Sequence, residues 1–379
     1  MNNRNFLCAS AVKKVKSQNT NYKLPITNYM KTALKIIVLL AMVLLFSGMK
    51  VVQARDEFTK KIQKDFTVNP NDKLILDNKY GNIQCLNWEK NSVSIEVTIT
   101  VLAHDQDDAN KLFDRISIVF NNPDGVVEAR TVMQEGRTPG NSHFSIDYKV
   151  NMPVTLNLDL SNKYGDVFIN ELSGKGNLKL GYGNMDINKL SNSDNLLDIK
   201  YSKVDVESMK GAVVMLKYSE MQLGYAGSIM LDSKYSDLDA DKVVFLNIIF
   251  EGGKLSTENS STLMSKSKYS DLKINRLEKN LNLDIQYGSC TIAEMPADFT
   301  DIVIKNRYAN VDIGISPEAS YSLEANLKYC DLDFPEEMAR LSQKIIQYDD
   351  HTYIGRVGRS ENSGSKVKID SEYGNVKLQ

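Results

Sequence analysis

Apolar and polar residues alternate with a period of two over most of the chain after residue 57, which predicts β-strands. One short motif interrupts this alternation: a tyrosine, a small residue, usually Asn or Asp, and then an aliphatic residue. The motif begins at Tyr80, Tyr164, Tyr182, Tyr201, Tyr218, Tyr235, Tyr269, Tyr287, Tyr308, Tyr329 and Tyr373. Neighbouring copies from Tyr164 to Tyr235 are 17 to 19 residues apart. The next interval is twice as long, and Gly252-Gly253-Lys254-Leu255 occupies the place of the absent copy.

Counting from each tyrosine as position 0, position +3 is apolar in every copy, and positions −6, −4 and −2 are frequently apolar. The change from even to odd positions predicts a bend at the motif. Asn or Asp at +2 is expected to adopt the left-handed backbone conformation of that bend. A repeat of about 17 to 21 residues is typical of a β-solenoid, in which each copy forms one stacked coil.

Rings at equivalent bends are expected to stack in a ladder that stabilises the coils. We predict that Tyr235→Ala lowers the free energy of unfolding by about 3–5 kcal/mol. The predicted ladder contains Tyr164, Tyr182, Tyr201, Tyr218, Tyr235, Tyr269, Tyr287, Tyr308 and Tyr329.

The segment between the first two copies does not follow the repeat and predicts a β-rich cap with one short helix. Asp105 is placed to cap a helix that ends at Phe113. Strands are expected at Val93–Val101, Ile116–Phe120, Val126–Met133 and Phe144–Val150. Beyond Phe334 we expect a helical turn, a hairpin over residues 345–357 and a last coil at Lys366–Leu378. The predicted divisions are residues 1–54, 55–150 (cap), 151–334 (solenoid) and 335–379.

Residues 1–54 have the layout of a secretory signal. Met30 is the expected start, Lys31 and Lys35 form the basic region, Ile36–Phe46 is apolar, and Val52-Gln53-Ala54 is a small-residue cleavage site. The alternative is a retained membrane anchor, but the apolar run is shorter than the roughly 20 residues that span a bilayer. The sequence therefore predicts cleavage after Ala54 and export to the periplasm, the outer-membrane surface or the extracellular space.

The charge of the remaining chain argues against a nucleic-acid partner. Residues 1–54 hold eight basic side chains and no acidic one, so the rest of the chain carries a formal charge of −10. Nucleic-acid binding depends largely on basic residues that neutralise phosphates. Cys85, Cys290 and Cys330 occupy motif positions that otherwise hold small or apolar residues, and we expect them to be buried or half-buried rather than reactive.

A basic residue precedes the tyrosine in most copies and forms a predicted row along the outside of the coils. This row has two interpretations: a solvated surface of weak ion pairs, or a binding face for an extended partner such as a glycan or another protein. Its members are Lys163, Lys200, Lys217, Lys234, Lys268, Arg307 and Lys328.

Carboxylates at position +4 do not follow the spacing of calcium-binding repeats, and we expect no metal or cofactor. These carboxylates include Asp186, Asp205, Asp239, Asp312 and Asp333. A polysaccharide lyase or glycosidase is the enzymatic alternative. It requires a groove with clustered carboxylates and a basic residue outside the row, whereas the acidic residues here are explained by the repeat. A purely structural envelope protein is a third possibility.

The motif copies resemble those of bacterial putative-adhesin β-strand-repeat families, long classed as domains of unknown function and related to the head domain of auto-transporter adhesins. The resemblance rests on Lys163-Tyr164-Gly165-Asp166-Val167, Tyr182-Gly183-Asn184-Met185, Tyr373-Gly374-Asn375-Val376-Lys377-Leu378, and the segment from Leu74 to Trp88 followed by Val93–Val101. It implies a right-handed β-solenoid in the cell envelope with a non-enzymatic adhesive or scaffolding role. It supplies no catalytic residue.

Overall fold

The computed structural model describes residues 26–46, 55–136, 142–361 and 364–379. The chain divides into two units, residues 1–54 and 55–379, and each is described by itself. The first unit contains helix α1 (Ile26–Phe46), which spans the basic and apolar regions predicted for the signal. Within the described residues, no helix combines the length and apolar character needed to cross a membrane. The predicted cleavage site at 52–54 lies outside the described residues.

The second unit is all-β apart from helix α2 (Gln106–Phe113) and the single 3₁₀ turn η2 (Glu336–Met338) in its described part. The N-terminal strands are β1 (Asp56–Thr67), β2 (Lys73–Lys79), β3 (Ile83–Asn87), β4 (Ser92–Ala103), β5 (Ile116–Asn121), β6 (Val126–Met133) and β7 (His143–Met152). The next strands are β8 (Asn157–Lys163), β9 (Val167–Leu172), β10 (Gly176–Gly181), β11 (Asn184–Leu190), β12 (Asn195–Lys200), β13 (Lys203–Lys217) and β14 (Glu220–Lys234). The remaining strands are β15 (Asp237–Met295), β16 (Asp301–Ile315), β17 (Tyr321–Lys328), β18 (Leu332–Asp333), β19 (Ala339–Gln347), β20 (Asp350–Val357), β21 (Ser365–Glu372) and β22 (Val376–Leu378).

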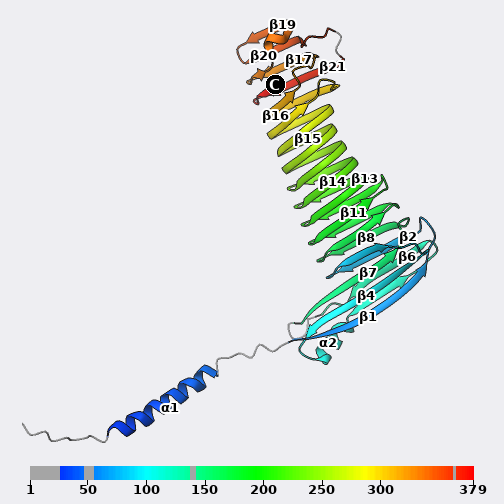
Figure 1. Ribbon diagram of the computed structural model, residues 1–379, viewed down its shortest axis with the longest axis vertical. Coiled ribbons are helices and arrows are strands. Elements are labelled where there is room, and N and C mark those ends of the chain that lie inside the picture. Colours follow the sequence, from blue (N-terminus) through cyan, green and yellow to red (C-terminus); the bar gives the residue numbers. More distant parts are fainter. Residues whose placement is uncertain (1–25, 47–54, 137–141, 362–363) are drawn as a thin grey trace, which may run out of the picture. The chain divides into compact units, whose positions relative to one another are not determined.

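Strands one motif copy apart pair in parallel and in register (Figure 1). Val213 in β13 pairs with Met230 in β14, and Met230 pairs with Asn247 in β15. Strands that follow the tyrosine form a second series, in which Val167 pairs with Met185 and Met185 with Val204. Each copy therefore contributes one strand segment before and one strand segment after its tyrosine, and both pair with the equivalent segments of neighbouring copies. In β13 and β14 the segment after one tyrosine continues into the segment before the next.

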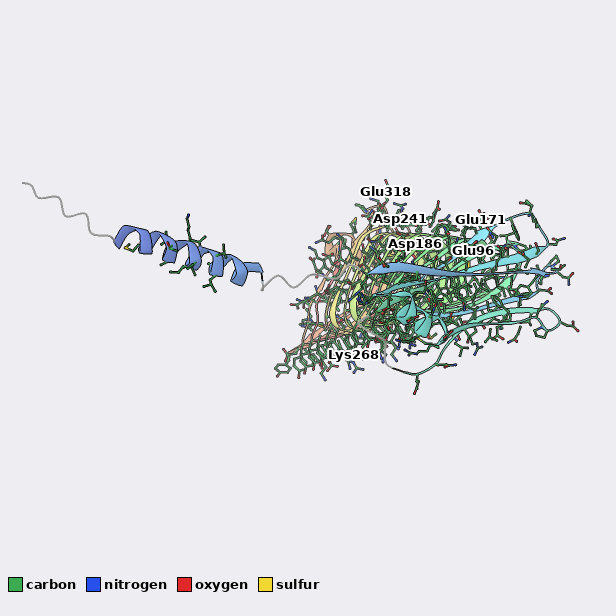
Figure 2. The ribbon with its side chains drawn as sticks, turned by 90° about the horizontal axis from the view of Figure 1, so that it is seen from below. Glu96, Glu171, Asp186, Asp241, Lys268 and Glu318 are labelled. Carbon is green, nitrogen blue, oxygen red and sulfur yellow. The ribbon has the colours of Figure 1, made fainter. Side chains whose placement is uncertain are left out.

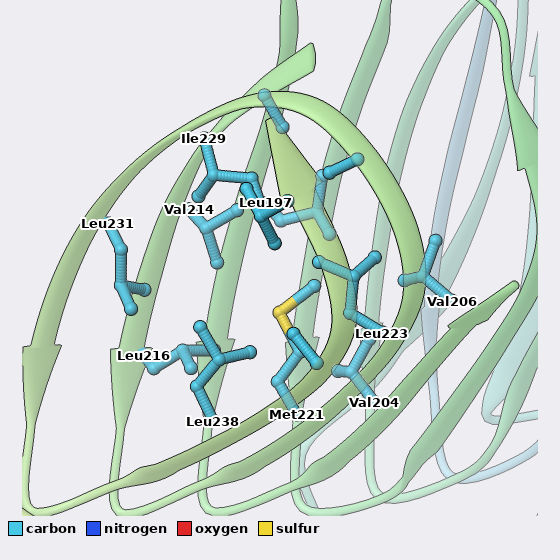
Figure 3. Close-up of a cluster of buried hydrophobic side chains, with 14 of the residues drawn as sticks. Leu197, Val204, Val206, Val214, Leu216, Met221, Leu223, Ile229, Leu231 and Leu238 are labelled. Carbon is cyan, nitrogen blue, oxygen red and sulfur yellow. The ribbon is translucent and has the colours of Figure 1, made fainter. Parts of the chain in front are cut away.

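The core lies between these two series of strands (Figure 3). Leu216 and Leu231 lie in the parts of β13 and β14 that precede a tyrosine, whereas Val204, Met221 and Leu238 lie in the parts of β13, β14 and β15 that follow one. All five side chains are at most 3% exposed. The apolar residues at positions −2, −4 and +3 thus fill one continuous interior, as the alternation predicts.

The segment between Tyr80 and Tyr164 forms strands that flank the first copies. β2 pairs with β8 in register, so the isolated Tyr80 copy lies directly against the Tyr164 copy. β4 pairs antiparallel with β1 and β7, and β5 pairs with β6. The predicted helix is confirmed: the Asp105 side chain accepts a hydrogen bond from the backbone N–H of Asp108, and Leu112 is buried.

The left-handed residue of each bend is the tyrosine itself. Backbone φ is between +51° and +68° at all eleven motif tyrosines and +69° at Gly252, which takes the same place. The expectation that Asn or Asp at +2 adopts this conformation is therefore wrong. Their side chains instead bond to the next copy: Asp166 accepts from the backbone N–H of Asn184, and Asp237 from that of Lys254, both at 2.8 Å.

The C-terminal copy does not end the stack, contrary to the sequence-based expectation. β21 pairs in parallel with both β16 and β17, so residues 365–372 lie between two copies that precede them in sequence (Figure 1). The antiparallel hairpin β19–β20 pairs with the outer edge of β17. This order covers the edge of β17, which would otherwise present unpaired backbone groups to another chain.

Candidate functional site: a tyrosine and lysine ridge

The motif tyrosines form two stacks of parallel rings, here called the tyrosine ridge. Neighbouring centroids are 4.8–5.4 Å apart, with interplanar angles of 1–22°. The first stack runs Tyr80, Tyr164, Tyr182, Tyr201, Tyr218, Tyr235, and the second runs Tyr269, Tyr287, Tyr308, Tyr373, Tyr329. Gly252 separates them. The ridge thus includes two tyrosines, Tyr80 and Tyr373, that carry the motif but were not assigned to the predicted ladder.

The ridge is a surface feature. From Tyr164 onward its rings are 40–58% exposed, because the bend turns them away from the core. A left-handed backbone costs a non-glycine residue about 1–2 kcal/mol, and stacking returns about 0.5–1.5 kcal/mol per ring pair. A ring with two neighbours can therefore offset the strain of its own bend.

The predicted basic row lies along one side of the ridge. Ammonium groups stand over tyrosine rings at Lys79, Lys163, Lys217, Lys268 and Lys328, with Nζ 4.6–5.8 Å from the ring centroids. Two other members of the row pair with carboxylates: Lys200 with Asp198 at 3.0 Å and Lys234 with Glu251 at 3.2 Å. The hydrogen bond to Glu251 raises the pKa of Lys234. The row is thus partly a cation–π row and partly a set of exposed ion pairs.

Asn and Asp side chains at position +2 follow the ridge on its other side. Asp166, Asp237 and Asp271 each accept hydrogen bonds from the next copy through Oδ1: Asp166 accepts two, and Asp237 and Asp271 accept one each. These three residues are exposed. An extended ligand on the ridge would therefore meet the edges and hydroxyl groups of the stacked rings, flanked by hydrogen-bond donors on one side and acceptors on the other.

An open concavity of about 680 Å³ lies at the C-terminal end of the basic row. Arg307 and Lys328 line it together with Lys305, which lies outside the row. Asp284, Asp350, Asp370, Glu372 and His351 also line it. The sequence did not predict this group, because Asp370 and Glu372 join it only through the insertion of β21, and Asp350 and His351 only through the pairing of β20 with β17.

The carboxylates at position +4 lie away from the basic row. Figure 2 shows Asp186, which is at position +4, projecting from one side of the stack and Lys268 from another. Asp186 is paired in register with Asp205, so these acidic residues form a row of their own. Within the described residues, no group of three or more His, Cys, Asp or Glu side chains is placed to hold a metal ion.

The three cysteines of the second unit are free thiols. Cys85 and Cys290 are buried, and burial raises the pKa of each to about 12. Cys330 is half-buried and its Sγ lies 3.4 Å from the backbone oxygen of Ser371. The expectation of buried or half-buried cysteines is confirmed. A thiol with so high a pKa is a poor nucleophile at neutral pH.

A scan against protein-family models finds no match, and a search of curated proteins finds none either. Solved structures do match. A putative adhesin from Parabacteroides distasonis is 10% identical, with a TM-score of 0.32, over 84% of this chain and 97% of the other. A putative adhesin from Bacteroides fragilis is 14% identical, with a TM-score of 0.28, over 84% and 97%. A putative lipid binding protein from Parabacteroides distasonis is 12% identical, with a TM-score of 0.22, over 84% and 97%.

Identities of 10–14% and TM-scores of 0.22–0.32 are too low to transfer a function to this chain. Three of the similar structures are named as putative adhesins and one as a putative cell adhesion protein. These names are consistent with the putative-adhesin family that the motif copies resemble.

Proposed function

We propose that this chain is a non-enzymatic, exported binding module of the cell envelope, and that its tyrosine ridge and basic row bind an extended glycan. The observation that carries the proposal is the exposure of the ridge: stacked rings that are 40–58% exposed form a long aromatic surface outside the core. Binding sites for small polar ligands combine aromatic surfaces with a few placed polar groups. The ridge repeats this combination in copy after copy.

Charge favours an uncharged glycan over a polyanion. The chain after residue 54 carries a formal charge of −10, which repels polyanions at long range. Sugar hydroxyls donate and accept hydrogen bonds, so they can pair with carboxylates such as Asp237 and with ammonium groups such as Lys217. The apolar faces of the sugar rings would lie on the tyrosines, which have both an apolar body and a polar end.

The same proposal includes the architecture and the location. A right-handed β-solenoid is supported by the parallel pairing of strands one motif copy apart, and its handedness is taken from the family resemblance. Export is supported by the signal-like layout of residues 30–54. N-terminal sequencing of the chain recovered from each cell fraction tests both its cleavage and its location. We expect a chain that begins after Ala54 and is recovered outside the cytoplasm. An unprocessed cytoplasmic chain would contradict export.

A glycan array probed with the full chain tests the ligand. We expect binding to extended uncharged glycans, and a loss of at least about tenfold in affinity for Tyr201→Leu with Tyr218→Leu, because the change removes two exposed hydroxyl groups, each worth about 0.5–1.5 kcal/mol in hydrogen bonds to the ligand. Tyr225→Leu is the matched control: Tyr225 is 42% exposed in a neighbouring strand but lies outside the ridge. Equal losses in both variants, or binding only to proteins on a parallel protein array, would overturn the proposal.

The carbohydrate-active alternative is tested on the same ligand. The carboxylates beside Lys305 in the C-terminal concavity are the group that an enzyme would use. Incubation of the full chain with a bound glycan should release no new reducing or unsaturated ends. Release that disappears in Asp370→Asn with Glu372→Gln would assign the chain to the enzymes.

A further inference from the structure

An open concavity of about 760 Å³ lies on the outer side of the strand segments that precede the tyrosines. Its volume is in the range of about 300–1,000 Å³ that is common for ligand sites. It crosses the neighbouring strands β2, β8, β10, β12, β13 and β14. Five strand spacings of about 4.8 Å give it a length of about 24 Å. Its lining residues stand five to eight positions before the tyrosines, so the concavity is separate from the tyrosine ridge.

The concavity is narrow, and small residues keep it open. Gly211 and Ser228 are aligned at position −7 of β13 and β14, and Phe245 follows them in β15. A Cβ on Gly211 would lie 2.8 Å from the backbone oxygen of Ser193, so no side chain can fill the hollow there. Positions −7 to −5 are two residue steps, which give a width of about 7 Å at about 3.3 Å per step. This width accepts a single alkyl chain.

Side chains at position −5 change from polar to apolar along the concavity. Asp159 and Asn177 occupy this position in β8 and β10. Leu196, Val213 and Met230 follow in β12, β13 and β14 and are here called the apolar lane. Val213 and Met230 are 42% and 55% exposed. One half of the concavity therefore offers hydrogen-bonding groups, and the other half offers an apolar surface.

The polar half carries two charges of each sign. Lys73 pairs with Asp159 at 3.0 Å, and Lys175 pairs with Asp194 at 3.4 Å. All four side chains are partly exposed and line the concavity. Because this half is neutral overall and has both signs, it complements a zwitterion better than an anion or a cation. A phosphate would accept hydrogen bonds from the lysines, and a substituted ammonium group would face the aspartates.

We propose that the concavity binds one single-chain zwitterionic lipid, with its phosphate at Lys73 and Lys175 and its alkyl chain along the apolar lane. Two residue steps by five strand spacings cover about 160 Å². Each partner in a stable protein complex contributes about 800 Å², so this area fits a lipid chain and not a folded protein.

The apolar lane sets a limit on the length of the alkyl chain. From Leu196 to the strand of Phe245 there are three strand spacings, about 14 Å. Carbon–carbon bonds of about 1.5 Å advance an extended chain by about 1.3 Å each, so about 11 carbons span this distance. A fully buried methylene tightens binding about fourfold. The concavity is open and covers about half of the chain, so we expect about twofold per carbon.

Titration calorimetry of the full chain with alkylphosphocholines of about 8 to 14 carbons tests the lane. Each compound is used below the concentration at which it forms micelles. Affinity should rise with chain length and level off near about 11 carbons. Val213→Glu should weaken binding of dodecylphosphocholine about tenfold or more. Val119→Glu is the matched control, because Val119 is 39% exposed in β5 and does not line the concavity. Binding of the compounds to α1 is common to both variants, so the difference between them reports the concavity.

A second pair of ligands tests the head group. Lys73→Gln with Lys175→Gln should weaken dodecylphosphocholine about tenfold and leave a dodecyl oligoethylene glycol ether, which has the same chain and an uncharged head, within about twofold. Val213→Glu should leave glycan binding by the ridge unchanged, so the two proposals can fail separately. Equal affinities of Val213→Glu and Val119→Glu, a rise in affinity that does not level off, equal losses for both head groups, or binding to phosphocholine vesicles alone would each overturn the proposal.

Discussion

Tyr218 and Tyr235 offer a test of how much ring stacking contributes to stability. Both have a φ of +51°, so both carry the same strain at the bend. Tyr218 stacks on Tyr201 and on Tyr235, at 5.1 and 5.3 Å. Tyr235 stacks on Tyr218 alone, because the next copy has Gly252 in place of tyrosine. Truncation to alanine therefore removes two ring pairs at Tyr218 and one at Tyr235.

The structure lowers the expected cost at Tyr235. Tyr235 is 56% exposed, so truncation to alanine loses the burial of somewhat less than half of the tyrosine surface. About 80 Å² at 25 cal/mol per Å² gives about 2 kcal/mol, and the single ring pair adds about 0.5–1.5 kcal/mol. We expect Tyr235→Ala to cost about 2.5–3.5 kcal/mol, at the lower end of the 3–5 kcal/mol expected for a buried ring. Tyr218→Ala should cost about 1 kcal/mol more, for the second ring pair.

Urea unfolding followed by far-ultraviolet circular dichroism measures both costs. The slope against urea must match that of the wild-type chain, because a long repeat array can lose two-state behaviour. A Tyr235→Ala cost equal to or greater than that of Tyr218→Ala would refute the stacking account. So would costs below about 0.5 kcal/mol in both variants, which is the ordinary range of surface substitutions.

Three further predictions concern other parts of the second unit. Gly252→Tyr should join the two stacks and stabilise the chain by up to about 2 kcal/mol, whereas Gly252→Ala should destabilise it by about 1 kcal/mol, because alanine adds backbone strain without a ring. A lower melting temperature for Gly252→Tyr than for Gly252→Ala would contradict continuity of the ridge. Burial raises the pKa of Cys85 and Cys290 from 9.0 to about 12, so between these pH values the folded chain keeps protons that the unfolded thiols lose. The free energy of unfolding should therefore be unaffected below pH 9 and fall by about 1.4 kcal/mol per thiol per pH unit above it. Urea unfolding at several pH values should show a shallower fall in Cys85→Ala with Cys290→Ala, and an unchanged fall would contradict this origin. Asp105→Ala should cost about 0.5–2 kcal/mol through loss of the α2 cap, and a melting temperature equal to that of Asp107→Ala would show that the cap contributes nothing.

Much of the fold could be predicted because the repeat shows in both periodicity and bend chemistry. Alternation by two locates the strands, and the apolar +3 position locates the core face of β9, β11 and β13. The capped helix α2 was predictable because Asp105 precedes an amphipathic run. These features were predictable because residue propensity and side-chain spacing along a short segment determine them.

The bend conformation and the C-terminal order were not predictable from local sequence. Tyrosine rarely adopts a positive φ, so intrinsic preference pointed to Asn or Asp. The tyrosine does so here because its ring stacks on neighbours contributed by other copies, and no single copy contains that information. The insertion of β21 between β16 and β17 depends on the hairpin β19–β20, which already occupies the outer edge of β17.

The candidate site was predicted in part. The basic residues and the rings could be named from the motif, but their roles could not: Lys217 stands over a ring, whereas Lys234 pairs with Glu251. The exposed apolar side chains on the outer side of β13 and β14, such as Val213 and Met230, were also missed, because only the strand registers between copies align them on one surface.

The affinity of the full chain for one uncharged glycan at increasing chain length tests the central claim most directly. If the ridge is a continuous binding surface, affinity measured by calorimetry should rise with each added sugar until the ligand spans several rings, and Tyr201→Leu with Tyr218→Leu should remove most of that gain. Equal affinities for short and long glycans would contradict the claim. So would the absence of binding to every glycan on a full array.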